Sequence, residues 1–188
     1  MKSTAIVPAA GRAERFGGAK LLADVGGVPM LDRTLRCLID GGVDEIVVVL
    51  PPAGRFEPVR LLTEPQVMMV VNPDPSRGMF SSIQVGVEIA QGDPLIVLPA
   101  DMPFVSSQTV AAVLAAHARA AGDIVVPRHG GRRGHPIALP ARLRPFVLRA
   151  PATGNLSDVL KASGVTRLEI DVEDAGILRD VDVTGDLS

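Results

Sequence analysis

Aromatic side chains are scarce in this chain of 188 residues, which holds five Phe and neither Trp nor Tyr. Binding of single-stranded nucleic acid by stacking bases on aromatic platforms is therefore nearly excluded. A basic excess is missing as well, since 19 Lys and Arg stand against 21 Asp and Glu and the formal net charge is −2. Proteins that neutralise nucleic-acid phosphates usually carry such an excess, so we expect no nucleic-acid partner.

Cysteine and long apolar runs are also lacking. Cys37 is the single cysteine, so no internal disulfide can form, and this composition fits a reducing compartment. The N-terminal apolar stretch 5–10 is short and is followed at once by charged residues, unlike a signal peptide. No apolar run approaches the roughly 20 residues of a membrane span. We therefore expect a cytoplasmic protein that makes no membrane contact.

Short apolar runs alternate with longer segments of helical spacing. The pattern predicts strands at 4–7, 45–50, 67–71, 95–98, 123–126, 136–139 and 165–170, and helices over 29–40, 81–90 and 107–121. Strands that are apolar on both faces and separated by helices indicate a mostly parallel sheet covered on both sides. Reversals around Gly130 and Pro140 make the sheet mixed. We predict one α/β domain over residues 1–188, built as a three-layer sandwich.

Ligands bind such sheets at the carboxyl ends of the strands, so the loop that follows the first strand is of interest. It spans residues 8–20 and is rich in small residues, whose successive N–H groups can form an anion-binding concavity. Arg15 could hold phosphate oxygens bidentately and Lys20, one of three lysines, could add a point charge. The loop matches neither the Walker nor the Rossmann fingerprint. The alternative is an ordinary Gly-rich surface loop.

Acidic residues stand at a second strand end and near the C-terminus. Asp101 follows the strand 95–98 between two prolines, where a carboxylate suits Mg²⁺, an ion that takes one or two carboxylates together with substrate phosphates. The alternative is a turn Asp that bonds its own backbone. Asp180, Asp182 and Asp186 alone would be a solvated acidic tail. Paired with Asp101, this cluster would complete a metal clamp.

A basic loop lies in the middle of the chain. Between residues 119 and 149 there are seven arginines and one acid, whereas eight acids and three basic residues follow residue 149. Arg132, Arg133 and His135 in this loop could steer an anionic second substrate, and the alternative is a solvated hairpin tip. His117 extends an apolar stripe and is expected at the edge of the core. The chain has no Gly-x-Ser-x-Gly, so nothing supports a serine hydrolase.

Taken together, these segments resemble the MobA-like nucleotidyltransferases, especially their molybdenum-cofactor cytidylyltransferase branch. The resemblance runs from about residue 4 to residue 187, and the order and spacing of its motifs make it specific. The matching positions are Ala9-Ala10-Gly11, Arg15, Gly17 and Lys20, then Asn72, Gly78-Met79 and Ser82, then Asp101-Met102-Pro103, Arg133-Gly134-His135-Pro136 and Asp180-Val181-Asp182.

The resemblance implies a Rossmann-like GT-A fold and an enzyme that transfers a nucleoside monophosphate from an NTP to a phosphate-bearing acceptor. The Ala-Ala-Gly form of the first loop favours CTP over GTP, and the acceptor would be molybdopterin or molybdenum cofactor. Arg15, Lys20 and Asp101 would be catalytic, and Asp101 with Asp182 would hold Mg²⁺. Arg132, Arg133 and His135 would bind the acceptor. The nucleotide would contact Pro8, Ala9, Ala10, Gly11, Arg15, Lys20, Asn72, Gly78, Ser82 and Asp101.

Three departures from the family pattern keep alternatives open. The second motif lacks the aromatic residue that relatives often carry, so we expect the nucleobase to be read by backbone groups near residues 8–10 and by Ser82. The stretch 151–155 and the tail after Asp182 also differ, and both bear on the acceptor. One alternative is a cytidylyltransferase for a sugar or polyol phosphate. Another is a nucleotide-binding chaperone without turnover, partnered with a molybdoenzyme.

Overall fold

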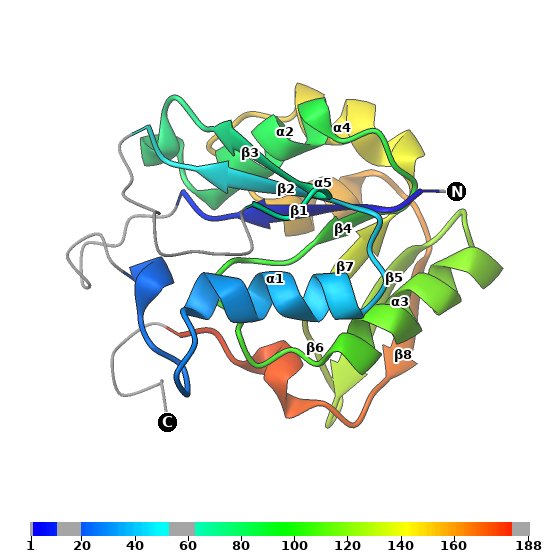
Figure 1. Cartoon of the computed structure of the whole chain (residues 1–188). Helices are drawn as coiled ribbons and strands as arrows, with labels where there is room; N and C mark the ends of the chain where they lie inside the picture. Colours follow the sequence, from blue (N-terminus) through cyan, green and yellow to red (C-terminus); the bar gives the residue numbers. More distant parts are fainter. Residues whose placement is uncertain (1, 11–19, 53–62, 182–188) are drawn as a thin grey trace.

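A mixed β-sheet forms the centre of the computed structural model, which describes residues 2–10, 20–52 and 63–181. The strands lie in the order β3-β2-β1-β4-β7-β5-β6, and β8 pairs with β5 (Figure 1). Their bounds are β1 Thr4–Pro8, β2 Glu45–Leu50, β3 Val67–Val71, β4 Leu95–Val97, β5 Ile124–His129, β6 Arg132–Arg133, β7 Ile137–Leu139 and β8 Arg167–Asp171.

The first four strands run parallel to one another. Thr4 of β1 lies opposite Glu45 of β2 on one side and Leu95 of β4 on the other, and β3 continues the parallel order beside β2. Beyond β4 the direction changes, because β7 is antiparallel to both β4 and β5, while β8 is parallel to β5. The predicted mixed sheet is confirmed, and the carboxyl ends of β1 to β4 meet at one edge.

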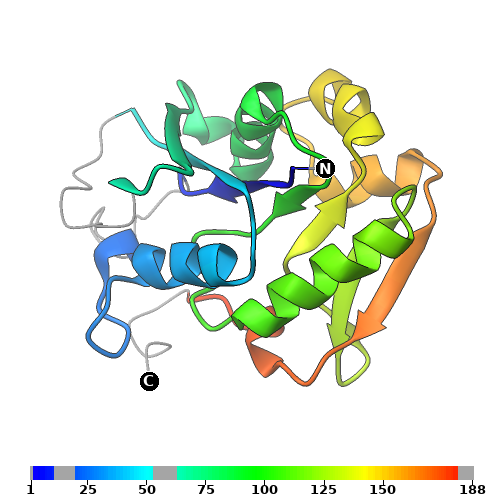
Figure 2. The same ribbon diagram turned by 45° about the vertical axis from the view of Figure 1, so that its right-hand side comes forward.

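Helices cover both faces of this sheet (Figures 1 and 2). Helices α1 (Met30–Asp40) and α3 (Ser107–Arg119) pack on one face, and α2 (Met79–Ile89), α4 (Arg144–Arg149) and α5 (Leu156–Ala162) pack on the other. Alternate residues of β1 serve the two layers, since Ala5 and Val7 join the α1 side and Ile6 joins the α2 side. The predicted three-layer arrangement follows from this alternation.

Close packing fixes α2 against the sheet. Gly86 lies where a Cβ atom would come within 2.4 Å of the Ile6 side chain, so only glycine lets the helix approach β1 this closely. No helix in residues 2–10, 20–52 and 63–181 is long and apolar enough to cross a membrane.

Candidate functional site

Three loops meet at the carboxyl edge of the parallel strands. After β1, the Ala9 N–H donates to the Val49 carbonyl at 2.9 Å, and the Pro8 carbonyl accepts from the Ala100 N–H at 3.2 Å. After β3, the Asn72 N–H donates to the Leu50 carbonyl at 2.9 Å. These bonds place the residues that follow β1 and β4 side by side and those that follow β3 one strand away, beyond β2, along the same edge.

The beginning of the first loop is buried, with Ala9 6% and Ala10 2% exposed. Two backbone groups that we expected to read a nucleobase, the Ala9 N–H and the Pro8 carbonyl, are already bonded to neighbouring strands. Lys20 opens the short 3-10 helix Lys20–Leu22. Gly11, Arg15 and Asp182 lie outside the described residues, so their roles stay predictions.

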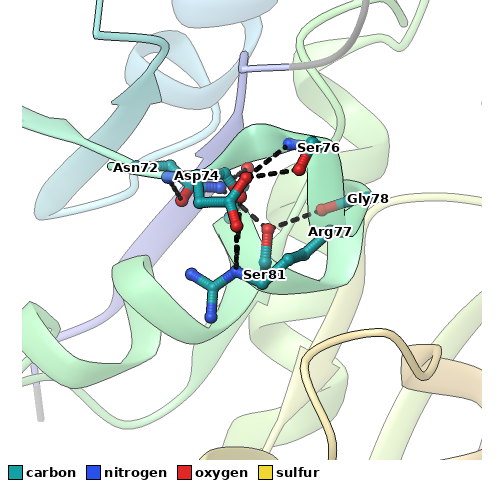
Figure 3. A network of polar contacts seen from close by, with 7 residues as sticks. Asn72, Asp74, Ser76, Arg77, Gly78 and Ser81 are labelled. Atoms are coloured by element: carbon teal, nitrogen blue, oxygen red, sulfur yellow. Dashed lines mark hydrogen bonds and ion pairs between the residues drawn. The ribbon is translucent and has the colours of Figure 1, made fainter.

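A buried hydrogen-bond network joins β3 to α2 (Figure 3). Asn72 is fully buried, and its Nδ2 donates to Ser81 Oγ at 2.8 Å and to Ser82 Oγ at 3.0 Å. Its Oδ1 accepts from the Asp74 N–H at 3.1 Å. The Ser81 hydroxyl in turn donates to the Gly78 carbonyl at 2.7 Å. The predicted nucleotide contacts Asn72 and Ser82 are therefore both engaged inside the protein, where they set the path of residues 72–82.

Gly78 connects the short 3-10 helix Pro75–Arg77 to α2 (Figure 3). Its φ of +96° is a left-handed conformation that favours glycine. Asp74 begins the 3-10 turn, accepting bonds from the hydroxyl and the N–H of Ser76, and its carboxylate lies 3.4 Å from Arg77 Nε. These interactions hold the pKa of Asp74 below its ordinary value, and the hydrogen bond from the Ser76 hydroxyl has the largest effect. The turn is thus preorganised where β3 ends, at the carboxyl edge of the parallel strands.

Asp101 stands in the turn after β4, partly exposed. The Met102 N–H donates to the Pro99 carbonyl at 3.3 Å, and the Thr34 hydroxyl of α1 donates to the Ala100 carbonyl at 3.0 Å. The end of the described chain returns to this turn, because the Val181 N–H donates to the Asp101 carbonyl at 2.9 Å. Strand β4 and the C-terminal segment therefore meet at the backbone of Asp101, and the metal clamp of Asp101 with Asp182 stays a prediction.

His135 lies beside this turn on the opposite side from the β1 loop. Its ring Nδ1 is 3.3 Å from the Val97 carbonyl, and its backbone N–H donates to the Ile177 carbonyl at 3.0 Å. The adjacent Gly134 is required, because a Cβ atom there would lie 2.2 Å from the Ile177 oxygen. Burial lowers the pKa of His135, although the Val97 carbonyl and the carboxylates of Asp101 and Asp180 act in the opposite direction.

A pocket of about 350 Å³ opens next to His135, between α2 and α5. Of the three predicted acceptor residues, Arg133 and His135 line this pocket, whereas exposed Arg132 does not belong to its lining. Most of the lining is apolar. It comprises Met79, Ile83, Val97, Pro99, Val126, Arg133, Gly134, His135, Ile137, Asn155, Leu156, Ser157, Leu160 and Arg167.

Sequence reasoning missed the contribution of α5 and β8 to this pocket. Asn155 caps α5, its side chain accepting from the Asp158 N–H at 2.9 Å, and an Asn before an apolar residue is a signal that could have revealed the helix. Arg167 carried no such signal. A wider depression of about 920 Å³ lies between α1 and residues 103–108, and it contains none of the predicted site residues.

Acids of β8 offset part of the basic loop's charge. Arg133 Nε lies 3.1 Å from Glu169, and Arg128 Nε lies 2.8 Å from Asp171. The arginine excess that is visible in the sequence is therefore partly neutralised where β6, β5 and β8 adjoin, and the steering field predicted for this loop is weaker than the residue count suggests.

The donor set at Asp101 fits a hard divalent cation. The described part of the chain holds no cluster of three or more His, Cys, Asp or Glu that could form a closed metal site. It does bring the carboxylates of Asp101 and Asp180 close enough for both to act on His135. One or two carboxylates with room for other oxygen ligands suit Mg²⁺, which takes its remaining ligands from phosphates and water.

Comparison with known proteins assigns a family to this site. Residues 5–168 match the family described as "MobA-like NTP transferase domain". The nicotine blue oxidoreductase of Paenarthrobacter nicotinovorans is 34% identical over 77% of this chain and 74% of its own length. The molybdenum cofactor cytidylyltransferase of Escherichia coli K12 is 22% identical over 96% of this chain and 91% of its own length. The 2-C-methyl-D-erythritol 4-phosphate cytidylyltransferase of Rhodococcus opacus is 28% identical over 65% and 54%, respectively.

Solved structures share the fold. Rv0371c from Mycobacterium tuberculosis H37Rv superposes with a TM-score of 0.80 and 22% identity, covering 99% of this chain and 96% of that one. A structure of Rv0371C in complex with manganese gives a TM-score of 0.71 at 24% identity, over 99% and 95% of the two chains.

Proposed function

We propose that this chain, which belongs to the MobA-like NTP transferase family, transfers CMP from CTP to a phosphate-bearing acceptor of the molybdopterin type and releases pyrophosphate. The observation that carries the proposal is the position of Asp101. It lies where the ends of β1 and β4 meet the C-terminal segment, and His135 and the 350 Å³ pocket lie on its far side. Such a carboxylate stands between a nucleotide on the β1 side and an acceptor in the pocket.

The reaction forms a bond from an acceptor phosphate oxygen to the α-phosphorus and breaks the bond from that phosphorus to the pyrophosphate oxygen. Both reactants are anions, so the site must neutralise charge and align an in-line displacement. Arg15 and Lys20 are proposed to hold the triphosphate. No general base is needed, because a phosphate monoester is already ionised at neutral pH. His135, held neutral by burial, then positions rather than deprotonates the acceptor.

Asp101, with Asp182 or Asp180, is proposed to hold Mg²⁺. The bound ion would supply positive charge to the phosphoryl oxygens of both substrates. Support comes from the carboxylate donors at this turn and from a solved relative described as a manganese complex. Asn72 and Ser82 are proposed to act through the loop that they brace, and Gly78 lies at the start of α2 in that loop.

The acceptor is the less constrained part of the proposal. The name of the Escherichia coli relative, which covers nearly the whole chain, supports molybdenum cofactor. The name of the Rhodococcus relative supports a polyol phosphate instead. The largely apolar lining of the pocket favours a ring-bearing acceptor over a polyol, whose hydroxyls would meet few partners there.

A second candidate is a redox activity, since a relative with 34% identity is named an oxidoreductase. Transfer is favoured because the loop after β1 lacks the Gly-x-Gly-x-x-Gly fingerprint of dinucleotide binding, whereas the carboxylate of Asp101 after β4 suits a site for a metal ion and phosphates. Consumption of NADH or NADPH with a quinone dye distinguishes the two activities. We expect no consumption of NADH or NADPH. Steady consumption in the absence of CTP and GTP would replace the transferase proposal.

Pyrophosphate release, measured with CTP or GTP, Mg²⁺ and each acceptor class, tests the proposal. We expect release with CTP and molybdopterin. For Asp101→Asn we expect release that is slower by at least about 100-fold, because changing even the outer partners of metal ligands typically costs about 10- to 100-fold. Asp40→Asn, an exposed carboxylate at the end of α1, is the matched control and should retain the wild-type rate.

Three outcomes would overturn parts of this proposal. Thermal stabilisation by GTP alone would contradict the choice of CTP. Release only with a polyol phosphate would contradict the molybdopterin acceptor. Nucleotide binding without pyrophosphate release from any acceptor, unaffected by Asp101→Asn, would favour a chaperone without turnover.

A further inference from the structure

The pocket beside His135 has an unusual charge composition. Its lining is mainly apolar, and the described residues that line it include two guanidinium groups, Arg133 and Arg167, but no carboxylate. A cavity of this size is large enough for a small organic ligand. Its two cations and missing acids favour an anion over a neutral or cationic molecule.

The two arginines differ in what they already contact. Arg133 pairs with Glu169, at 3.1 Å from Nε, and its side chain is 53% exposed. Arg167 is only partly exposed, its Nε is buried, and that atom has no hydrogen-bond partner in the described part of the chain. Leaving a buried N–H of this kind unpaired is unfavourable, because the group has lost its bond to water. Native proteins nearly always satisfy such groups with an acceptor from protein, water or ligand, so this N–H at the lining of the pocket is available to an acidic group of a ligand.

The position of Arg167 separates it from the reaction edge. Arg167 lies on β8 opposite Ile124 of β5, whereas Val126, which also lines the pocket, is two residues further along β5. Two residues correspond to roughly 7 Å along a strand. Pro99 and His135 line the same pocket beside Asp101. The pocket therefore extends from the carboxyl edge of the sheet to a cation deeper between α5 and β8.

We infer that Arg167 binds a second anionic group of the acceptor, at the far end of an apolar body that fills the pocket from His135 to β8. The inference rests on the proposed function for the identity of the ligand as acceptor, and it adds the chemical class: an organic anion with charge at both ends. The reacting phosphate lies at the Asp101 end, and the second acidic group accepts a hydrogen bond from the Nε–H of Arg167.

The neutral Gln side chain can still donate hydrogen bonds from its NH₂ group but carries no charge, so Arg167→Gln removes the proposed attraction while keeping a polar side chain. Arg167→Lys keeps the charge and loses the fork-shaped donor. Arg149→Gln, an exposed arginine on α4 outside the pocket lining, is the matched control.

Direct binding tests the site without turnover. Phenyl phosphate is the probe, because its single anionic group stands in for the second acidic group of the acceptor and its ring for the apolar body. Inorganic phosphate and phenol are its separated halves, and the readout is the NMR signal of the Arg167 Nε–H. We expect phenyl phosphate to bind at least tenfold more tightly than either half and to shift this signal. Arg167→Gln should weaken phenyl phosphate binding about tenfold and leave phenol unchanged, whereas Arg149→Gln should change neither.

Equal binding of phenyl phosphate by wild type and Arg167→Gln would overturn the inference, and so would a shift caused equally by inorganic phosphate alone. An arginine that only covers apolar surface with its stem would lower stability when replaced, without changing the ratio of phenyl phosphate to phenol binding.

Kinetics separates this inference from the proposed function. With an active acceptor, Arg167→Gln should raise KM for the acceptor 10- to 100-fold and leave the CTP dissociation constant and kcat within a factor of three. Arg167→Lys should fall between. If wild type shows no transfer but binds phenyl phosphate through Arg167, the transferase proposal fails and the anion site stands. If the enzyme transfers the nucleotide and Arg167→Gln leaves the KM for the acceptor unchanged, the transferase proposal stands and the anion site at Arg167 fails.

Discussion

Asn72 uses every polar atom of its side chain inside the protein. Its two N–H donors bond to Ser81 and Ser82, and its oxygen accepts from the Asp74 backbone. A buried amide in a low-dielectric interior stabilises the fold only when it is fully satisfied, as it is here. The sequence indicated that Asn72 and Ser82 matter, but residue type alone cannot distinguish a side chain that contacts a ligand from one that shapes the loop around it.

Asn72→Ala should lower the free energy of unfolding by about 2–3 kcal/mol, because two buried hydroxyls and the part-buried N–H of Asp74 each lose a partner. Urea denaturation measures this loss. Asn155→Ala, which removes an exposed helix cap, should cost only about 1 kcal/mol. A loss below about 0.5 kcal/mol for Asn72→Ala, no larger than that of an ordinary surface substitution, would show that the network contributes little.

Helix α3 begins on a carboxylate that is distant in sequence. Asp174 Oδ2 accepts from the Ser106 N–H at 2.9 Å and from the Thr109 hydroxyl at 2.6 Å, and Oδ1 accepts from the Gly176 N–H at 2.9 Å. The carboxylate thus ties the start of α3 to the segment that leads from β8 toward Asp101. The sequence predicts the helix from residue 107 onward, whereas nothing in it connects Asp174, one of eight acids after residue 149, with the start of that helix.

The pKa of Asp174 gives this tie a pH dependence. Burial raises this pKa, but the hydrogen bonds from Thr109, Ser106 and Gly176 outweigh burial and lower it. Because the folded-state pKa lies below the unfolded value of about 3.9, the stabilisation is complete above about pH 4 and is lost as pH falls through the folded pKa.

Asp174→Ala should therefore cost about 1–2 kcal/mol at pH 7, since a helix cap and two further bonds are lost. The difference from wild type should shrink below pH 4. Thermal unfolding at pH 7, 4 and 3 measures both effects, with Glu173→Ala at the exposed neighbour as the control. A difference that stays constant with pH would contradict the charged cap.

Strongly periodic elements were predictable from sequence. The predicted strands 45–50 and 67–71 agree with β2 and β3 to the residue. Helix α1 begins immediately after Pro29 and ends immediately before Gly41, close to the predicted bounds 29–40. Helices α4 and α5 were not predicted. The first has six residues and begins with Arg144-Pro145, and the second has seven residues. Both are shorter than the roughly 11 residues over which a helical pattern can be recognised.

At the scale of the whole molecule, one sheet divides the proposed chemistry between two halves. The parallel strands β1 to β4 present the edge with Asp101, and the mixed strands β5 to β8 present the pocket with His135 and Arg167. Topology made the first half predictable, because parallel strands must end at one edge. The second half depends on which residues β8 and α5 place against each other, and no local pattern reveals such a contact between distant segments.

Cys37 reports on the opening of the whole fold. It is the single cysteine of the chain, is 8% exposed, and its Sγ lies 3.1 Å from the Thr34 carbonyl. Burial first, and then nearby acids, raise its pKa to about 12, so at pH 8 almost no thiolate is present in the folded protein.

Reaction of Cys37 with a disulfide reagent at pH 8 should be about a thousandfold slower in the folded protein than in urea, where the thiol pKa returns to about 8.5. Absorbance of the released thiol measures the rate. Ala111→Cys adds a thiol at an exposed position of α3, and this second thiol should react at once. Rapid labelling of wild type without denaturant would show that α1 opens locally.

The central place of β1 has a consequence for synthesis of the chain. Thr4 pairs with residue 45 on one side and with residue 95 on the other. At roughly 5–20 residues per second, roughly 5–20 s pass on the ribosome between the appearance of β1 and that of its second neighbour. Throughout that interval an apolar strand destined for the middle of the sheet keeps one open edge. The nascent chain must therefore be shielded until β4 emerges.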